Sequence, residues 1–117
     1  MDDHRLKLKG IWKGTQTVIN GELGHGEPRR LEYTIKEEPH DGQKFFLYEK
    51  GVDSGGDYET MRTASLDNRK ITWTDNQSQD KGEIDVVGSD GMSGKYIRAN
   101  GSILKEYLLK KVPREGS

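Results

Sequence analysis

Turn-forming residue pairs recur along the whole chain, and this recurrence limits the fold more than any other feature of the sequence. Asn-Gly and Asp-Gly pairs favour tight hairpin turns, because the central residues of such turns need a positive φ. The turn signals are Asn20-Gly21, Asp41-Gly42, Ser54-Gly55-Gly56-Asp57, Asp67-Asn68, Asp75-Asn76, Asp90-Gly91 and Asn100-Gly101. From the third onward their spacing is close to the about 8–12 residues that is typical of an all-β sandwich or barrel. No segment shows the sustained i, i+3, i+4, i+7 apolar pattern of a long helix.

The segments between these signals predict eight short strands in one domain. Their expected ranges are 5–19, 30–38, 43–50, 58–66, 70–75, 82–88, 92–99 and 102–112. The chain of 117 residues has the length of a single domain, and only residues 113–117 have the pattern of a loose tail. Eight such strands in one open layer would leave two exposed edges, whereas closure removes both. We therefore expect a closed, eight-stranded antiparallel up-and-down β-barrel over residues 1–117.

Alternation of apolar and polar residues predicts which side chains point into this barrel. The segment 30–38 shows it most clearly, because Leu31, Tyr33 and Ile35 alternate with charged and polar residues. The run from Phe45 to Tyr48 is apolar on both faces, so its inward side cannot be assigned. The other expected inward residues are Leu6, Leu8, Gly10, Trp12, Gly14, Gln16, Val18, Tyr58, Thr60, Arg62, Ala64, Leu66, Ile71, Trp73, Gly82, Ile84, Val86, Met92, Gly94, Tyr96 and Arg98.

The last expected strand, 102–112, also carries apolar residues on both faces. Leu104 and Leu108 lie on one face, and Ile103, Tyr107 and Leu109 lie on the other. Choosing the leucine face as the inner one would turn Glu106 inward and leave three large apolar residues outside. Such an exposed face is unusual for a monomer. We therefore expect a homodimer through Ile103, Tyr107 and Leu109, with a second sheet layer of the same chain as the competing explanation.

Composition argues against several classes of function. Nineteen basic and twenty acidic residues give a net charge of −1. A nucleic-acid-binding protein normally has a clustered positive face, and this balanced composition does not indicate one. No apolar run approaches the about 18–20 residues of a spanning helix, and the first residues lack the apolar stretch of a signal peptide. Cysteine is absent, and the three histidines lack metal-binding spacing. We expect no metal, cofactor or catalytic group, and a cytoplasmic location, with a mature secreted chain as the alternative.

One short motif at the start of the chain resembles a known family. Gly10-Ile11-Trp12, on the first strand of an eight-stranded meander, resembles the opening signature of the lipocalin and calycin barrels, and is also similar to the first strand of avidin-like barrels. The resemblance implies that Trp12 closes the barrel floor beneath a basic side chain from a late strand. Arg98, Lys105 and Lys110 are the candidates for that cover. The resemblance implies a fold and names no ligand.

Polar residues on the expected inner face suggest where a ligand would bind. An arginine inside a barrel needs an internal carboxylate, an aromatic ring or an anionic ligand group. The candidate ligand-binding set of the barrel interior is Tyr33, Tyr48, Tyr58, Arg62, Trp73, Tyr96 and Arg98.

Two hypotheses of function follow from this interior. In the first, the barrel holds a small amphipathic or hydrophobic molecule, with its polar end near Arg62 or Arg98, and carries out no catalysis. In the second, side chains fill the barrel, and the protein is an interaction or inhibitor module that acts through its surface.

Overall fold

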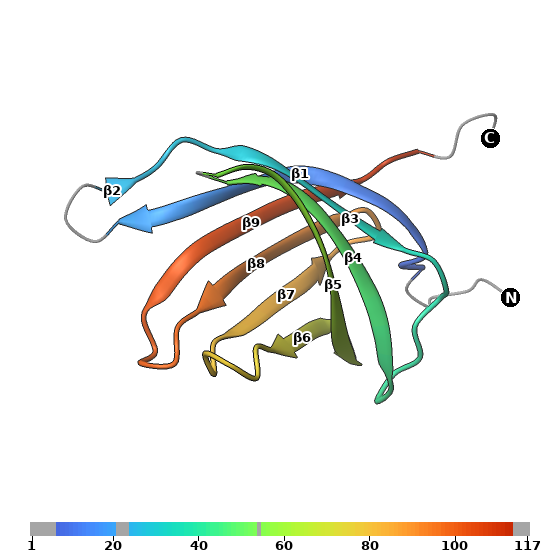
Figure 1. Ribbon diagram of the computed structural model, residues 1–117. Helices are drawn as coiled ribbons and strands as arrows, with labels where there is room; N and C mark the ends of the chain where they lie inside the picture. Colours follow the sequence, from blue (N-terminus) through green and yellow to red (C-terminus); the bar gives the residue numbers. More distant parts are fainter. Residues whose placement is uncertain (1–6, 21–23, 54, 114–117) are drawn as a thin grey trace, which may run out of the picture.

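The computed structural model describes residues 7–20, 24–53 and 55–113, and over these ranges the chain forms nine β-strands (Figure 1). The strands are β1 (Gly10–Asn20), β2 (Gly24–His25), β3 (Arg29–Ile35), β4 (Lys44–Asp53), β5 (Gly56–Asp67), β6 (Lys70–Thr74), β7 (Lys81–Val87), β8 (Gly91–Ile97) and β9 (Ile103–Lys111). All neighbouring strands are antiparallel. The strands other than β2 correspond to the eight that the turn signals predict.

Pairing of the first long strand with the last one closes the sheet. The order runs from β1 through β3 to β9, and β9 returns to pair with β1 from Trp12↔Lys111 to Val18↔Lys105. In Figure 1 the red β9 lies beside the blue β1. The two-residue β2 pairs only with the end of β1, through Ile19↔His25 and Asn20↔Gly24, and extends the wall at one rim. The closed eight-stranded antiparallel meander barrel is therefore confirmed.

A buried apolar core surrounds Trp12 inside the barrel. The Trp12 side chain is fully buried, and its Nε1 donates a hydrogen bond to the Leu8 carbonyl at 2.9 Å. Glu38 accepts hydrogen bonds from the backbone N–H groups of Leu8 (2.5 Å) and Lys9 (3.2 Å), which fixes the entering chain beneath the barrel. The remaining buried apolar residues are Leu31, Tyr33, Ile35, Leu47, Ala64, Leu66, Ile71, Trp73, Ile84, Val86, Met92, Tyr107 and Leu109.

The basic cover on Trp12 comes from a residue that the sequence did not single out. Lys111 Nζ lies 5.7 Å from the centroid of the Trp12 ring and donates to the Lys7 carbonyl at 2.6 Å. Lys111 is the β9 residue paired with Trp12, so both side chains point to the same face. Lys110, one position away, points to the opposite face, and Lys105 lies over Tyr96 (5.9 Å) toward the other end of the barrel. Arg98 follows β8 and is exposed, so it too is wrong as the cover.

Most of the expected inward positions are confirmed. Leu31, Tyr33 and Ile35 are buried, as are the expected apolar residues of β6 and β7. Val18 differs, since its side chain is 41% exposed close to the rim. The unassigned run in β4 has Leu47 buried and Phe46 exposed, so the odd-numbered residues of β4 point inward. Leu6 lies outside the described residues.

The expected inner face of the last strand is wrong. Tyr107 and Leu109 are buried inside the barrel, whereas Leu108 is 65% exposed and Glu106 is also on the outside. The register explains the difference, because Tyr107 pairs with Gln16 and Leu109 pairs with Gly14, two inward positions of β1. Tyr107 and Leu109 therefore contribute to the core and not to a subunit interface. The predicted dimer surface through Ile103, Tyr107 and Leu109 does not exist as one exposed face.

A small residue is needed where the barrel closes. A Cβ on Gly14 would stand 1.8 Å from the Leu108 carbonyl oxygen and 2.6 Å from the Leu109 Cα, both of which are backbone atoms of β9. Rigid backbone cannot move aside without breaking the β1–β9 ladder. Gly26 is a matched comparison, because its added Cβ would meet nothing closer than 3.4 Å.

We expect Gly14→Ala to lower the free energy of unfolding by about 3 kcal/mol, since it forces β1 and β9 apart. Gly26→Ala should change it by less than about 0.5 kcal/mol. Urea unfolding followed by tryptophan fluorescence measures both values. Equal stability of the two variants would show that closure at Gly14 tolerates a side chain.

Candidate functional site

A buried carboxylate is the centre of a polar cluster inside the barrel. Glu49 points inward from β4 and is 1% exposed. The Tyr58 hydroxyl donates to Glu49 Oε2 at 2.5 Å, and Arg62 Nε donates to Glu49 Oε1 at 2.7 Å. Both partners come from alternate positions of β5, which brings their side chains to the same face as Glu49. The negative charge is therefore compensated inside the barrel, as a buried charge requires.

Gln16 extends this cluster across to β1. Its Nε2 donates to the Tyr58 hydroxyl at 2.8 Å and to the Val52 carbonyl at 3.3 Å. The chain of hydrogen bonds thus runs from Gln16 through Tyr58 to Glu49 and on to Arg62. It links β1 to the consecutive strands β4 and β5, and β1 is far from both of them in the sequence. The expected inward position of Gln16 is confirmed, since its side chain is buried.

Three aromatic rings lie beside the polar cluster. The ring centroids of Tyr33, Trp73 and Tyr107 are 6.2–6.3 Å apart, with Tyr33 edge-on to the other two. The Arg62 guanidinium carbon lies 5.3 Å from the centroid of the Trp73 ring, a distance at which a cation is attracted to the ring face. Trp73 fits only because its neighbour on β7 is Gly82, where an added Cβ would stand 2.2 Å from the indole.

The surroundings keep the tyrosines protonated and the arginine charged. Burial raises the pKa of Tyr33 and of Tyr107, and the charge of Glu49 raises both further. Burial and the hydrogen bond to Glu49 raise the pKa of Tyr58. Burial acts to lower the pKa of Arg62, but the hydrogen bond and charge of Glu49 outweigh it and raise that pKa above its ordinary value. The hydroxyls of the interior are therefore neutral hydrogen-bond donors at physiological pH.

Three polar atoms in this interior are buried without a hydrogen-bond partner among the described residues. They are Gln16 Oε1, the Tyr33 hydroxyl and Trp73 Nε1. The Tyr33 hydroxyl lies near Glu49 but makes no hydrogen bond of normal geometry with it. A buried polar atom left unpaired costs about 1–3 kcal/mol. Two unpaired donors and one unpaired acceptor thus face the barrel interior.

Five of the seven predicted site residues point into the barrel. Tyr33, Tyr58, Arg62 and Trp73 come together around Glu49, from three different strands. Tyr96 is half-buried nearer the rim, where its hydroxyl donates to Asp80 Oδ2 at 3.2 Å.

The other two predicted site residues are wrong as interior residues. Tyr48 points outward from β4, beneath the Lys36 ammonium group, whose Nζ lies 4.5 Å from the centroid of the Tyr48 ring. The inward side of β4 is occupied by Leu47 and Glu49, so the alternation excludes Tyr48. Arg98 is exposed in the turn after β8, where its backbone N–H donates to the Ser102 carbonyl.

Sequence reasoning missed Glu49 and assigned Tyr107 to the wrong face. The signal for Glu49 was its spacing, since it lies two and four residues after Leu47 and Phe45. The apolar Phe46 and Tyr48 between them obscured that alternation. For Tyr107, only the pairing partner on β1 decides the face, and the sequence alone does not supply it.

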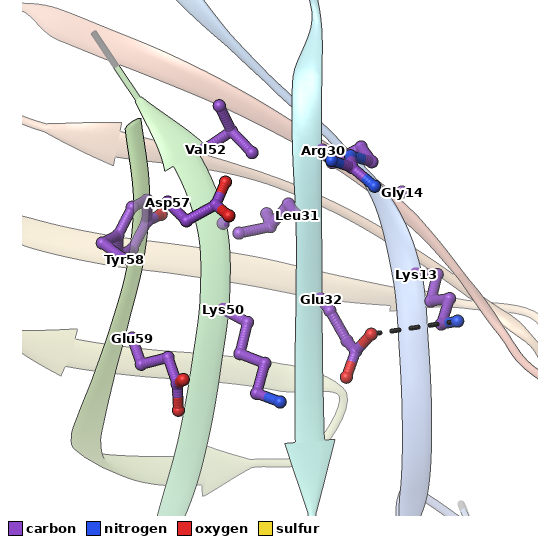
Figure 2. Close-up of a pocket in the computed structure, with 11 residues that line it drawn as sticks. Lys13, Gly14, Arg30, Leu31, Glu32, Lys50, Val52, Asp57, Tyr58 and Glu59 are labelled. Carbon is purple, nitrogen blue, oxygen red and sulfur yellow. Dashed lines mark ion pairs between the residues drawn. The ribbon is translucent and has the colours of Figure 1, made fainter. Parts of the chain in front are cut away.

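A groove on the outer wall has a different character (Figure 2). It has a volume of about 400 Å³ and crosses β1, β3, β4 and β5. Its charged lining consists of Lys13, Arg30, Lys50, Glu32, Asp57 and Glu59. Lys13 and Glu32 form an ion pair at 3.9 Å. Because basic and acidic groups alternate across it, this groove favours neither an anion nor a cation.

No group of three or more potential metal-binding side chains gathers among the described residues 7–20, 24–53 and 55–113. The same ranges hold no helix of the length and apolarity needed to cross a bilayer.

Comparison with known proteins bears on the fold. Neither a protein-family model nor a curated protein matches this sequence. A solved structure of the siderocalin Ex-FABP, a protein that functions through dual ligand specificities, aligns with a TM-score of 0.54 and 14% sequence identity. The alignment covers 93% of this chain and 76% of that chain. At this identity the likeness concerns the fold alone, and the chain therefore has a lipocalin-like barrel fold.

Proposed function

We propose that this protein binds a small amphipathic or hydrophobic molecule inside its barrel and carries out no catalysis. The observation that carries the proposal is the set of unpaired polar atoms in the interior, Gln16 Oε1, the Tyr33 hydroxyl and Trp73 Nε1. A ligand that accepts a hydrogen bond from the indole and donates one to the amide would remove an energetic cost already present in the fold. The lipocalin-like fold supports the same conclusion, because eight strands enclose space for one small ligand.

The interior combines apolar and polar groups. One buried apolar cluster surrounds Trp12 and includes Tyr33, Trp73 and Tyr107. Glu49 and Arg62 place polar groups beside these three aromatic rings. Pockets for small molecules combine an apolar or aromatic wall with a few placed polar groups.

A second function, in which the protein acts as an interaction module through its outer surface, is favoured by one observation. Phe46 and Met61 are 54% and 51% exposed on the outer wall of β4 and β5, beside Tyr48. Large exposed apolar side chains that cluster in this way often mark contacts with other proteins.

We expect native mass spectrometry of freshly purified protein to show an adduct of discrete mass that leaves on unfolding. The adduct would identify the ligand by its mass and support the barrel as its site. A clean mass of the chain alone, unchanged after incubation with amphipathic small molecules, would contradict the proposal and favour the interaction module.

We expect Tyr33→Phe to weaken binding of that ligand by about three- to tenfold without lowering the free energy of unfolding, because the Tyr33 hydroxyl has no hydrogen-bond partner among the described residues. Tyr58→Phe is the matched control, since its hydroxyl donates to Glu49 and accepts from Gln16. Its loss should destabilise the protein by about 1.5–3 kcal/mol. Calorimetric titration and urea unfolding give the two quantities. Equal destabilisation by both variants would show that the Tyr33 hydroxyl is structural.

We expect Arg62→Gln to destabilise the protein by about 3–5 kcal/mol, because it leaves the Glu49 charge buried without its cation. Adding Glu49→Gln should recover most of that loss, so that the double variant lies within about 1.5 kcal/mol of the original protein. Urea unfolding of the two single variants and the double variant completes the cycle. Additive effects of the two substitutions would show that the pair is not coupled.

A further inference from the structure

The wall of the barrel has an opening where β5 and β6 separate. The two strands pair only from Asp67↔Lys70 to Ser65↔Thr72, although β5 extends back to Gly56. In Figure 1 the short β6 lies beside only one end of β5. A cleft of about 350 Å³ lies at this position. Such a volume is within the range of small-molecule sites.

This cleft connects the outer surface with the interior. Its lining includes Arg62 and Trp73, whose side chains point into the barrel, together with Thr63 and Thr74, which lie on the outer face of the same strands. Among the described residues the ladder between β5 and β6 ends at Ser65↔Thr72, and the Arg62 side chain is 21% exposed beyond that point. Arg62 and Trp73, at the edge of the polar cluster, are therefore reached through the wall at β5 and β6.

The chemistry of the cleft is that of an anion site. Its lining contains two cationic side chains, Lys44 and Arg62, and several hydroxyl groups, but no carboxylate. The outer groove of Figure 2, in contrast, mixes acids and bases. Two carboxylates interact with the charge of Arg62. Glu49 accepts a hydrogen bond from Arg62 Nε. Asp75 interacts with Arg62 through its charge, while its Oδ1 accepts hydrogen bonds from the N–H groups of Gln77 and Ser78.

Arg62 is held in position with part of its hydrogen-bonding capacity unused. Its Nε is bound to Glu49 at 2.7 Å, and its guanidinium lies over Trp73. Its terminal nitrogens Nη1 and Nη2 have no partner among the described residues, and the side chain is 21% exposed. A guanidinium offers five N–H donors in a fixed plane, and the outer pair suits a carboxylate or a phosphate.

The strand edge adds a backbone donor to this cleft. The Leu66 N–H is donated to the Gln43 carbonyl, on the β4 side of β5. Because successive residues of a strand direct their N–H groups to opposite sides, Ser65 and Thr63 direct theirs toward β6. The ladder ends at Ser65, so the Thr63 N–H faces the cleft beyond it.

We propose that this cleft holds the acidic group of the barrel's ligand, a carboxylate or a phosphate, on the terminal nitrogens of Arg62, with Lys44 and the Thr63 N–H as further donors. The inference rests on the proposed function and narrows it: the ligand is an amphipathic acid. Its apolar part lies against Trp73, the aromatic residue that lines the cleft. Ion pairing with Glu49 holds Arg62 in place without using the nitrogens that meet the ligand.

Three ligands with the same ten-carbon tail test this inference. Decanoate, decyl phosphate and decan-1-ol are titrated into the full chain at pH 7.5, below their micelle concentrations, by calorimetry. We expect at least one of the two acids to bind about tenfold more tightly than the alcohol, because charge-assisted hydrogen bonds form only with an anion. The better of the two acids distinguishes a carboxylate from a phosphate group.

Variants of the cleft residues test whether the preference for an acid over the alcohol arises in this cleft. In the double variant Glu49→Gln/Arg62→Gln, which keeps the interior neutral and paired, the preference for the acid should fall to within about threefold of the alcohol. Lys44→Gln should weaken only the acid, by about two- to threefold, since Lys44 lines the cleft from its exposed side. Lys50→Gln is the control, because Lys50 lies on the same strand but lines the groove of Figure 2.

The experiments distinguish failure of the anion site in the cleft from failure of the proposed ligand-binding function. If the alcohol binds as tightly as both acids, or if the preference survives in the double variant, the inference is wrong and the barrel ligand is not held by its acidic group at Arg62. If none of the three probes binds and native mass spectrometry shows no adduct, the proposed function itself is wrong, and the inference falls with it.

Discussion

The pairing of β1 with β9 is the constraint on which the rest of the structure depends. This ladder turns a meander into a tube, and it fixes the inward face of both strands at once. Gly14 allows the two backbones to approach, while Trp12 and Lys111 meet at the same register and cover the floor. Once closed, the barrel has an inside that water reaches only from its rim and from gaps in its wall. The polar residues placed inside must then satisfy one another.

Glu49 shows what this enclosure requires. A carboxylate can be buried on the inner face of β4 because each of its two oxygens accepts a hydrogen bond. The donors are Tyr58 and Arg62, which lie on the same face of the adjacent strand β5. The same arrangement fixes Arg62 over Trp73. The interior cluster is therefore preorganised by the pairing of β4 with β5 and needs no movement of the backbone to present its free donors. Preorganisation of this kind lowers the entropic cost of binding.

Much of the fold could be predicted from the sequence, because turn chemistry and period-2 alternation are local signals. Segments with a clean alternation, such as Leu31 to Ile35, were placed on the correct face. The errors arose where both faces are apolar, at Phe45 to Tyr48 and at Ile103 to Leu109, because there the face is decided by a partner strand distant in the sequence. Arg62 was recognised as an interior arginine, but its carboxylate partner lay in the unassigned strand. The cleft has no sequence signal of its own.

The cleft instead follows from unequal strand lengths. β5 has 12 residues and β6 has 5, so a barrel that contains both must leave much of one edge of β5 unpaired. The turn after Thr74 ends β6 there, because the Asp75 carboxylate accepts the N–H groups of Gln77 and Ser78 and bends the chain away. Unpaired strand edges are usually a liability. Here the edge lies beside Arg62 and Trp73, which both line the cleft, so the feature that weakens the wall also leaves Arg62 partly exposed.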